Sequence, residues 1–110
     1  MAIAAVSISP VGSGVSVSRH VAAALRVARA QDRVRWRLDP MFTTLEGDLG
    51  EVLALVARMQ EAVFAAGALR VSTVLKIDDR RDRAVGMEEK VRSVEAWLEA
   101  PKGGPRAHPE

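Results

Sequence analysis

The alternation of hydrophobic and polar residues divides the chain into four short extended segments and three longer helical ones. The clearest extended segment is residues 33–38, where Val34, Trp36 and Leu38 face one way and three arginines face the other. A glycine or proline lies near an end of each extended segment and separates it from the next element. The predicted strands are residues 2–9, 33–38, 41–46 and 69–78.

The helical segments repeat apolar residues every three or four positions. The most regular of them follows Asp48, which forms a capping-box pattern with Glu51, and it ends before Gly67. Pro101 ends the last helix because proline cannot continue the backbone hydrogen-bond ladder. The predicted helices begin at Ser16 or Ser18, at Asp48 and at Met87, and they end near residues 31, 66 and 100.

The order of these elements is βαββαβ followed by a helix. Two right-handed crossovers of this kind predict an antiparallel sheet with strand order 4-1-3-2, which is the ferredoxin-like α+β sandwich. Both crossover helices cover one face of the sheet, so the other face is left for solvent, a ligand or a second subunit. We expect residues 1–100 to form this single domain and residues 101–110, rich in glycine and proline, to be a disordered tail.

Composition narrows the classes of partner. Sixteen basic residues nearly balance fourteen acidic ones, and the first strand offers serines where an RNA-binding sheet needs aromatic residues, so we expect no nucleic-acid partner. No apolar run is long enough for a membrane span, and no cysteine is present, which favours a reducing compartment. We therefore expect a cytoplasmic protein that does not bind membranes. The core is thin in aromatic residues, which favours self-association.

The open face of the predicted sheet carries the candidate site. Glu46 and Lys76 project to the same end of it, with the small residue Ala5 between them, and a shallow polar pocket can form there. The alternative is that these charges form a solvated face or a salt bridge between subunits. A one-residue bulge would move Glu46 and exchange it for Thr43 or Leu45. The projected open-face residues are Ser7, Ser9, Thr44, Glu46, Ser72 and Lys76, with Arg35 and Arg37 along the edge.

Other candidate chemistry is weaker. The glycine loop at residues 12–14 can present N–H groups to an anion, but it matches no nucleotide-binding fingerprint. Three acidic residues within 78–82 can bind a cation or, since arginines are interleaved with them, form local ion pairs. His20 is expected on a helix surface and His108 in the tail. We expect no catalytic residue, no metal and no cofactor.

Several segments together resemble a known family, the MTH1187/YkoF-like thiamine-binding proteins. The resemblance runs from about Ile3 to Leu98. It is carried by Ser-Ile-Ser-Pro at residues 7–10, Pro-Met-Phe-Thr-Thr-Leu-Glu-Gly at 40–47, Glu-Ala-Val-Phe-Ala-Ala-Gly at 61–67, and Lys-Ile-Asp-Asp-Arg-Arg-Asp at 76–82. The chain departs from the family pattern at Phe42, where glycine is usual, and at Gln60, where histidine is usual.

The resemblance implies a subunit that assembles into homodimers or homotetramers and binds thiamine or its hydroxymethylpyrimidine part without catalysis. Glu46 can accept a hydrogen bond from the pyrimidine amino group or face the cationic thiazolium, and Trp36 or Phe42 can contact a ring. The alternatives are a structural or regulatory oligomer with no vitamin ligand, and an enzyme that uses Glu46 as general base beside Lys76. The expected ligand-binding residues are Ser7, Ser9, Thr43, Thr44, Glu46, Lys76 and Asp78.

Overall fold

A four-stranded antiparallel sheet in the order β2-β3-β1-β4 is the frame of the computed structural model, which describes residues 1–101 and 103. This order confirms the predicted ferredoxin-like sandwich. Most of the predicted tail lies outside the described residues. The elements are β1 (Ala2–Pro10), α1 (Ser18–Arg29), β2 (Arg35–Leu38), β3 (Thr43–Gly47), α2 (Leu49–Ala65), β4 (Val71–Asp79) and α3 (Met87–Glu99).

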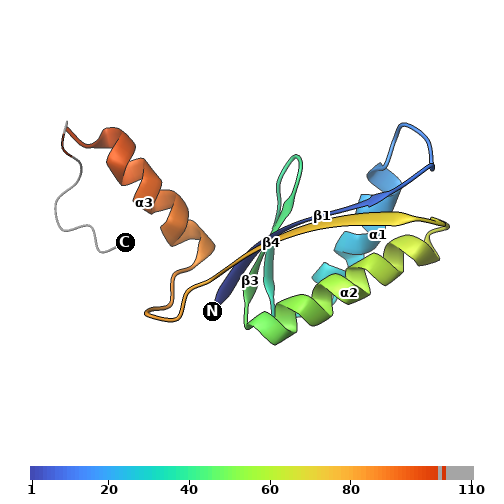
Figure 1. Ribbon diagram of the computed structural model, residues 1–110, viewed down its shortest axis with the longest axis horizontal. Coiled ribbons are helices and arrows are strands. Elements are labelled where there is room, and N and C mark those ends of the chain that lie inside the picture. The colour runs from blue at the N-terminus through green and yellow to red at the C-terminus, as the bar shows by residue number, and fades with distance from the viewer. Residues whose placement is uncertain (102, 104–110) are drawn as a thin grey trace.

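The two faces of the sheet follow the alternation along β1. Its even-numbered residues are buried under α1 and α2, and its odd-numbered residues are half-buried on the open face. Figure 1 shows α1 and α2 on the same side of the sheet. The largest fully buried side chains are Leu45, Leu55, Met59, Val52 and Val63.

The buried face of helix α1 differs from the expectation at His20. Its buried stripe is His20, Ala24 and Ala28, so the expectation of a surface histidine is wrong. Helix α1 packs on α2, and Arg19, next to His20, donates a hydrogen bond to the Ala66 carbonyl at the end of α2. The small alanines let the two helices approach, and the histidine is covered with them.

The hairpin between β2 and β3 is shorter than predicted at both strands. The predicted strand at residues 41–46 begins only at Thr43, because the Asp39 N–H donates to the Phe42 carbonyl at 3.0 Å and closes a tight turn. Pairing of β3 with β1 therefore stops at Thr43 opposite Val6. Residues 7–10 of β1 keep β4 as a neighbour and have no strand on their other side in the described part of the chain.

Helix α3 lies beyond the end of the sheet, apart from α1 and α2 (Figure 1). Met87 is its buried residue, and Val91, Val94 and Leu98 on the same stripe are exposed. None of the helices within the described residues is long and apolar enough to cross a membrane.

Candidate functional site

The seven predicted ligand-binding residues fall into separate places. Ser7, Ser9 and Thr43 line a pocket at the C-terminal end of β1. Thr44, Lys76 and Asp78 line a shallow hollow on the open face of the sheet. Glu46 is buried between β2 and the start of α3 and lines neither space.

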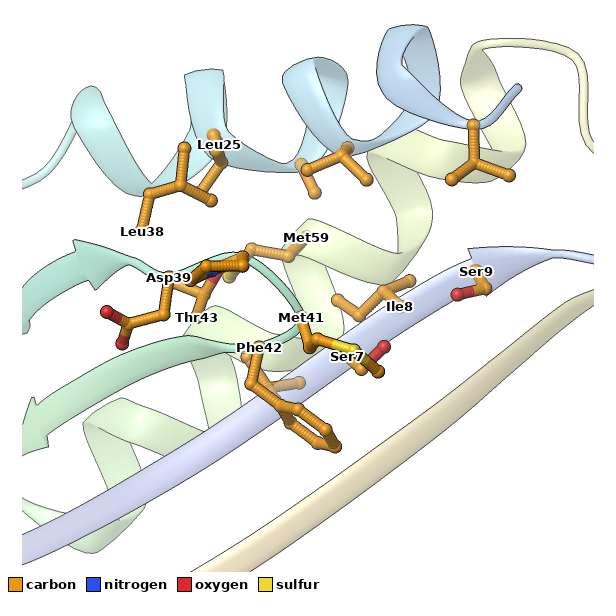
Figure 2. A pocket seen from close by; sticks show the side chains of 15 residues that line it. Ser7, Ile8, Ser9, Leu25, Leu38, Asp39, Met41, Phe42, Thr43 and Met59 are labelled. Atoms are coloured by element: carbon orange, nitrogen blue, oxygen red, sulfur yellow. The ribbon is translucent and has the colours of Figure 1, made fainter.

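The pocket at the end of β1 has a volume of about 150 Å³. It exists because the hairpin turns away from β1 after Val6 and leaves a space beneath α1. Figure 2 shows Leu25 from α1, Met59 from α2 and Ile8 from β1 converging on it, with Met41 of the hairpin beside Ser7. The lining residues are Val6, Ser7, Ile8, Ser9, Val17, Val21, Ala24, Leu25, Leu38, Asp39, Pro40, Met41, Phe42, Thr43 and Met59.

The lining is apolar with a few polar groups, which is the usual character of a small-molecule site. Aliphatic and methionine side chains form most of it, while the hydroxyls of Ser7, Ser9 and Thr43 supply donors and acceptors. Thr43 is 6% exposed and Ser7 is half-buried, so these groups are partly shielded from water. The pocket can therefore hold a small planar ring and hydrogen-bond its polar atoms.

Asp39 supplies negative charge at the pocket. Its carboxylate accepts a hydrogen bond from Thr44 Oγ1 at 3.0 Å and lies 3.4 Å from Arg37 Nε. Figure 2 shows this carboxylate pointing outward from the pocket. Asp39 is not among the residues that the sequence predicted for ligand binding. Its neighbour Pro40 marks a turn, but local sequence does not show that this turn folds back over the end of β1.

The paired strands of the open face have no bulge, but their register differs from the projection, in which Ala5 lies between Glu46 and Lys76. Ala5 lies between Thr44 and Lys76, and Ile3 lies between Glu46 and Asp78 in the next row. Asp78 accepts from Lys90 of α3 at 2.6 Å, and this hydrogen bond and charge hold the pKa of Asp78 below its usual range. The hollow here, of about 260 Å³, is therefore bordered by an ion pair that ties α3 to β4.

Glu46 is 4% exposed, and both carboxylate oxygens have partners. Oε1 accepts from the Met87 backbone N–H at 2.6 Å, and Oε2 accepts from Arg35 at 2.6 Å. Arg35 also donates to Glu88, and this hydrogen bond, with the helix N-terminus, lowers the pKa of Glu88 to about 2. The pair of carboxylates in turn raises the pKa of Arg35. The carboxylate of Glu46, which the sequence suggested as a ligand-binding group, holds the start of α3 against the sheet.

Comparison with known proteins decides the family. Residues 4–95 match the model of a family described as thiamine-binding protein. The chain belongs to that family. The UPF0045 protein YqgV of Bacillus subtilis is 39% identical over 103 residues, which cover 90% of this chain and 99% of YqgV. A UPF0045 protein of Staphylococcus xylosus is 42% identical over 102 residues, covering 89% of this chain and 95% of the relative. None of the relatives named here has an enzyme name.

Solved structures of similar proteins have the same fold. MJ1052 of Methanocaldococcus jannaschii superposes with a TM-score of 0.78 at 36% identity, over 86% of this thiamine-binding-family chain and 95% of MJ1052. TM0486 of Thermotoga maritima, at 19% identity, has a TM-score of 0.71 over 84% of this chain and 97% of its own. Both agree with the ferredoxin-like topology.

The remaining candidates on this thiamine-binding-family chain are accounted for locally. Asp82 is paired with Arg80, whose hydrogen bond lowers the pKa of Asp82 to about 2, and Asp79 is paired with Arg81. Among the described residues, no group of three acidic or histidine side chains has metal-binding geometry. The acidic residues within 78–82 are therefore structural ion-pair partners.

The glycine loop of the sequence analysis is exposed, and Gly12 and Gly14 in it have positive φ angles of 81° and 97°.

Proposed function

We propose that the protein binds thiamine or its hydroxymethylpyrimidine part, without chemical change, in the pocket at the end of β1. The observation that carries the proposal is the pocket of about 150 Å³ lined by Ser7, Ser9 and Thr43 in a member of the thiamine-binding protein family. An apolar cavity of about 150 Å³ is known to hold a benzene ring, so a six-membered heterocycle fits this space. The structural neighbour TM0486 carries a provisional assignment to thiamine biosynthesis or salvage, which agrees with this ligand class.

The pocket chemistry suits the two halves of thiamine differently. The pyrimidine ring packs against Leu25, Met59 and Met41, and the serine and threonine hydroxyls complement its ring nitrogens and amino group. The cationic thiazolium does not fit in the remaining volume and lies outside, toward the carboxylate of Asp39, where it shares this carboxylate with Arg37. Thr44, Lys76 and Asp78 on the open face contribute to the ligand only if a second subunit closes over that face.

A binding role is favoured over catalysis by the position of Glu46. Its carboxylate is engaged by Arg35 and the Met87 N–H, so it is not poised as a general base beside Lys76. Turnover of thiamine or hydroxymethylpyrimidine by the purified protein would contradict the binding role.

The test is calorimetric titration of protein that has been unfolded and refolded to remove carried ligand. Thiamine and hydroxymethylpyrimidine are each expected to give saturable heat with one site per subunit and a micromolar or lower dissociation constant. A sample of the thiazole alcohol alone serves as the control ligand and should give none. Absence of saturable heat from both pyrimidines, with the fold intact, would contradict the proposal.

We further propose that the protein is a homodimer or homotetramer in which the apolar stripe of α3 contacts a second copy. Val91, Val94 and Leu98 continue the stripe begun by the buried Met87 and are 45%, 61% and 76% exposed in the single chain. Val94→Glu should lower the mass measured by light scattering, whereas Ala96→Glu on the opposite side of α3 should not. A monomeric parent protein would contradict this assembly. An oligomer that binds neither pyrimidine would instead favour a structural role.

A further inference from the structure

The backbone of β1 has a defined direction at the pocket. The Val11 N–H donates to the Arg70 carbonyl at 2.8 Å, in the same register that pairs Pro10 with Val71. Odd-numbered residues of β1 therefore direct their backbone polar groups toward β4, and even-numbered residues direct theirs toward the opposite edge. Pro10 fits this pattern. Its position is even-numbered, so the N–H that proline lacks would point away from β4, and the pairing with β4 loses no hydrogen bond.

The opposite edge loses its partner strand at Ile8. Val6 is paired with Thr43, and the next position in register, opposite Ile8, belongs to Met41. Met41 lies in the hairpin turn outside β3, and no strand covers Ile8 there within the described residues. Ile8 and Met41 both line the pocket. The N–H and C=O of Ile8 thus point side by side, as one donor and one acceptor, to the edge of β1 that the hairpin leaves uncovered.

We propose that the Ile8 N–H and C=O are the recognition edge of the pocket, and that they select a planar nitrogen heterocycle with an acceptor next to an amino donor. An aminopyrimidine ring satisfies both groups at once, as a partner strand would. The volume of about 150 Å³ admits one such ring, so a second ring joined to it stays outside. This inference rests on the proposed function and adds to it that backbone atoms of Ile8 recognise the pyrimidine half.

The decisive measurement is the amide signal of Ile8 in ¹⁵N–¹H NMR spectra during titration with hydroxymethylpyrimidine. We expect Ile8 to show one of the largest shifts and slower hydrogen exchange at saturation. Thiamine should have the same effect, and a hydroxymethylpyrimidine that lacks the amino group should bind roughly tenfold more weakly because one hydrogen bond is lost.

Three results would overturn the inference. Calorimetric binding with an unmoved Ile8 amide would leave the proposed function standing and remove Ile8 from the site. An Ile8 amide protected without ligand, in proportion to protein concentration, would mean that a second copy covers this edge. No saturable binding of either pyrimidine would overturn the proposed function and this inference together.

A pair of variants tests the same donor. Ile8→Pro removes the N–H on the edge that β4 does not use, and Pro10 two residues later shows that this edge of β1 tolerates proline. Ile8→Val keeps the N–H and shortens the side chain, so it is the matched control. We expect roughly tenfold weaker pyrimidine binding for Ile8→Pro relative to Ile8→Val. Equal affinity of the two folded variants would exclude the donor, and the amide measurement decides if Ile8→Pro does not fold.

Discussion

Glu46 on β3 accepts a hydrogen bond at 2.6 Å from the backbone N–H of Met87, the first residue of α3. A helix N-terminus presents unpaired N–H groups and a partial positive charge. A buried carboxylate at this position accepts a hydrogen bond from an N–H group and is itself stabilised by the positive charge. Arg35 completes the arrangement by bonding Glu46 and Glu88 together. The orientation of α3, and with it the placement of its exposed apolar stripe, therefore depends on one acidic side chain of the sheet.

The first prediction concerns Glu46→Gln. The amide can still accept from Met87, but it loses the charge-assisted bond with Arg35 in a buried position, so we expect a loss of about 1–3 kcal/mol in unfolding free energy. Urea denaturation measures this loss, and hydrogen exchange at Met87 should accelerate. Glu51→Gln, which breaks the exposed pair with Arg33, is the control and should change stability by less than about 1 kcal/mol. Equal effects of the two variants would contradict the anchoring role.

Gly86→Ala tests the same contact sterically. A Cβ atom at residue 86 would lie 2.6 Å from Glu46 Oε1, closer than Cβ atoms in folded proteins approach a non-bonded neighbour. We expect the variant to displace α3 and lose about 1–3 kcal/mol in a thermal or urea unfolding measurement. Gly47→Ala is the matched control, because its Cβ would meet neighbours at 3.5 Å, an ordinary contact distance. A neutral Gly86→Ala would show that α3 is not held against Glu46.

The docking of α3 should depend on pH in the acidic range. The pKa of Glu88 is lowered from 4.5 to about 2, so its bond with Arg35 stabilises the docked helix fully above pH 4.5 and is lost as the pH falls toward 2. The Asp78–Lys90 pair changes in the same direction. Hydrogen exchange of α3 amides should quicken over this window before β1 and β3 unfold. In the Glu88→Gln variant, the share of this acceleration that comes from protonation of Glu88 should disappear. A pH profile of α3 exchange that is the same in the variant and the parent protein would contradict the role of Glu88.

Filling the mouth of the pocket should block the ligand. Val17 lines the pocket, whereas Val15, two residues earlier, is fully exposed and does not line it. Val17→Trp is expected to reduce affinity for hydroxymethylpyrimidine at least tenfold in calorimetry, because an indole ring takes up the volume that the ligand needs. Val15→Trp adds the same ring elsewhere and should leave the affinity unchanged. Similar affinities in both variants would place the ligand in another part of the molecule.

The two departures from the family pattern should behave differently. Phe42 lines the pocket, but the Gln60 side chain accepts a hydrogen bond from Thr73 Oγ1 at 2.5 Å and is not part of the lining. Phe42→Ala should weaken pyrimidine binding severalfold by removing an aromatic contact. Gln60→Ala should retain affinity and lose about 1 kcal/mol of stability, because the Thr73 hydroxyl loses its partner. A larger loss of affinity in Gln60→Ala would require a different site.

Local periodicity was sufficient for much of the fold. The strict alternation at residues 33–38 and along β1 assigns each side chain to a face, because a strand has a side-chain period of two. The antiparallel pairing of β1 with β3 and β4 followed from the crossover rules, but the predicted register was wrong, because Glu46 lies opposite Ile3 and not opposite Ala5. The buried His20 was not predictable in this way, because the sequence pattern of α1 does not fix which of its faces packs on α2.

The sequence by itself determined the ferredoxin-like topology, the family and the open-face positions of Thr44, Lys76 and Asp78. The tertiary structure alone decided that Glu46 docks α3 and that Ser7, Ser9 and Thr43 line one pocket. Both outcomes depend on contacts between distant segments, residues 46 and 87 in one case and the hairpin turn against β1 in the other. Periodicity reports which face a residue occupies, and only packing determines what lies against that face.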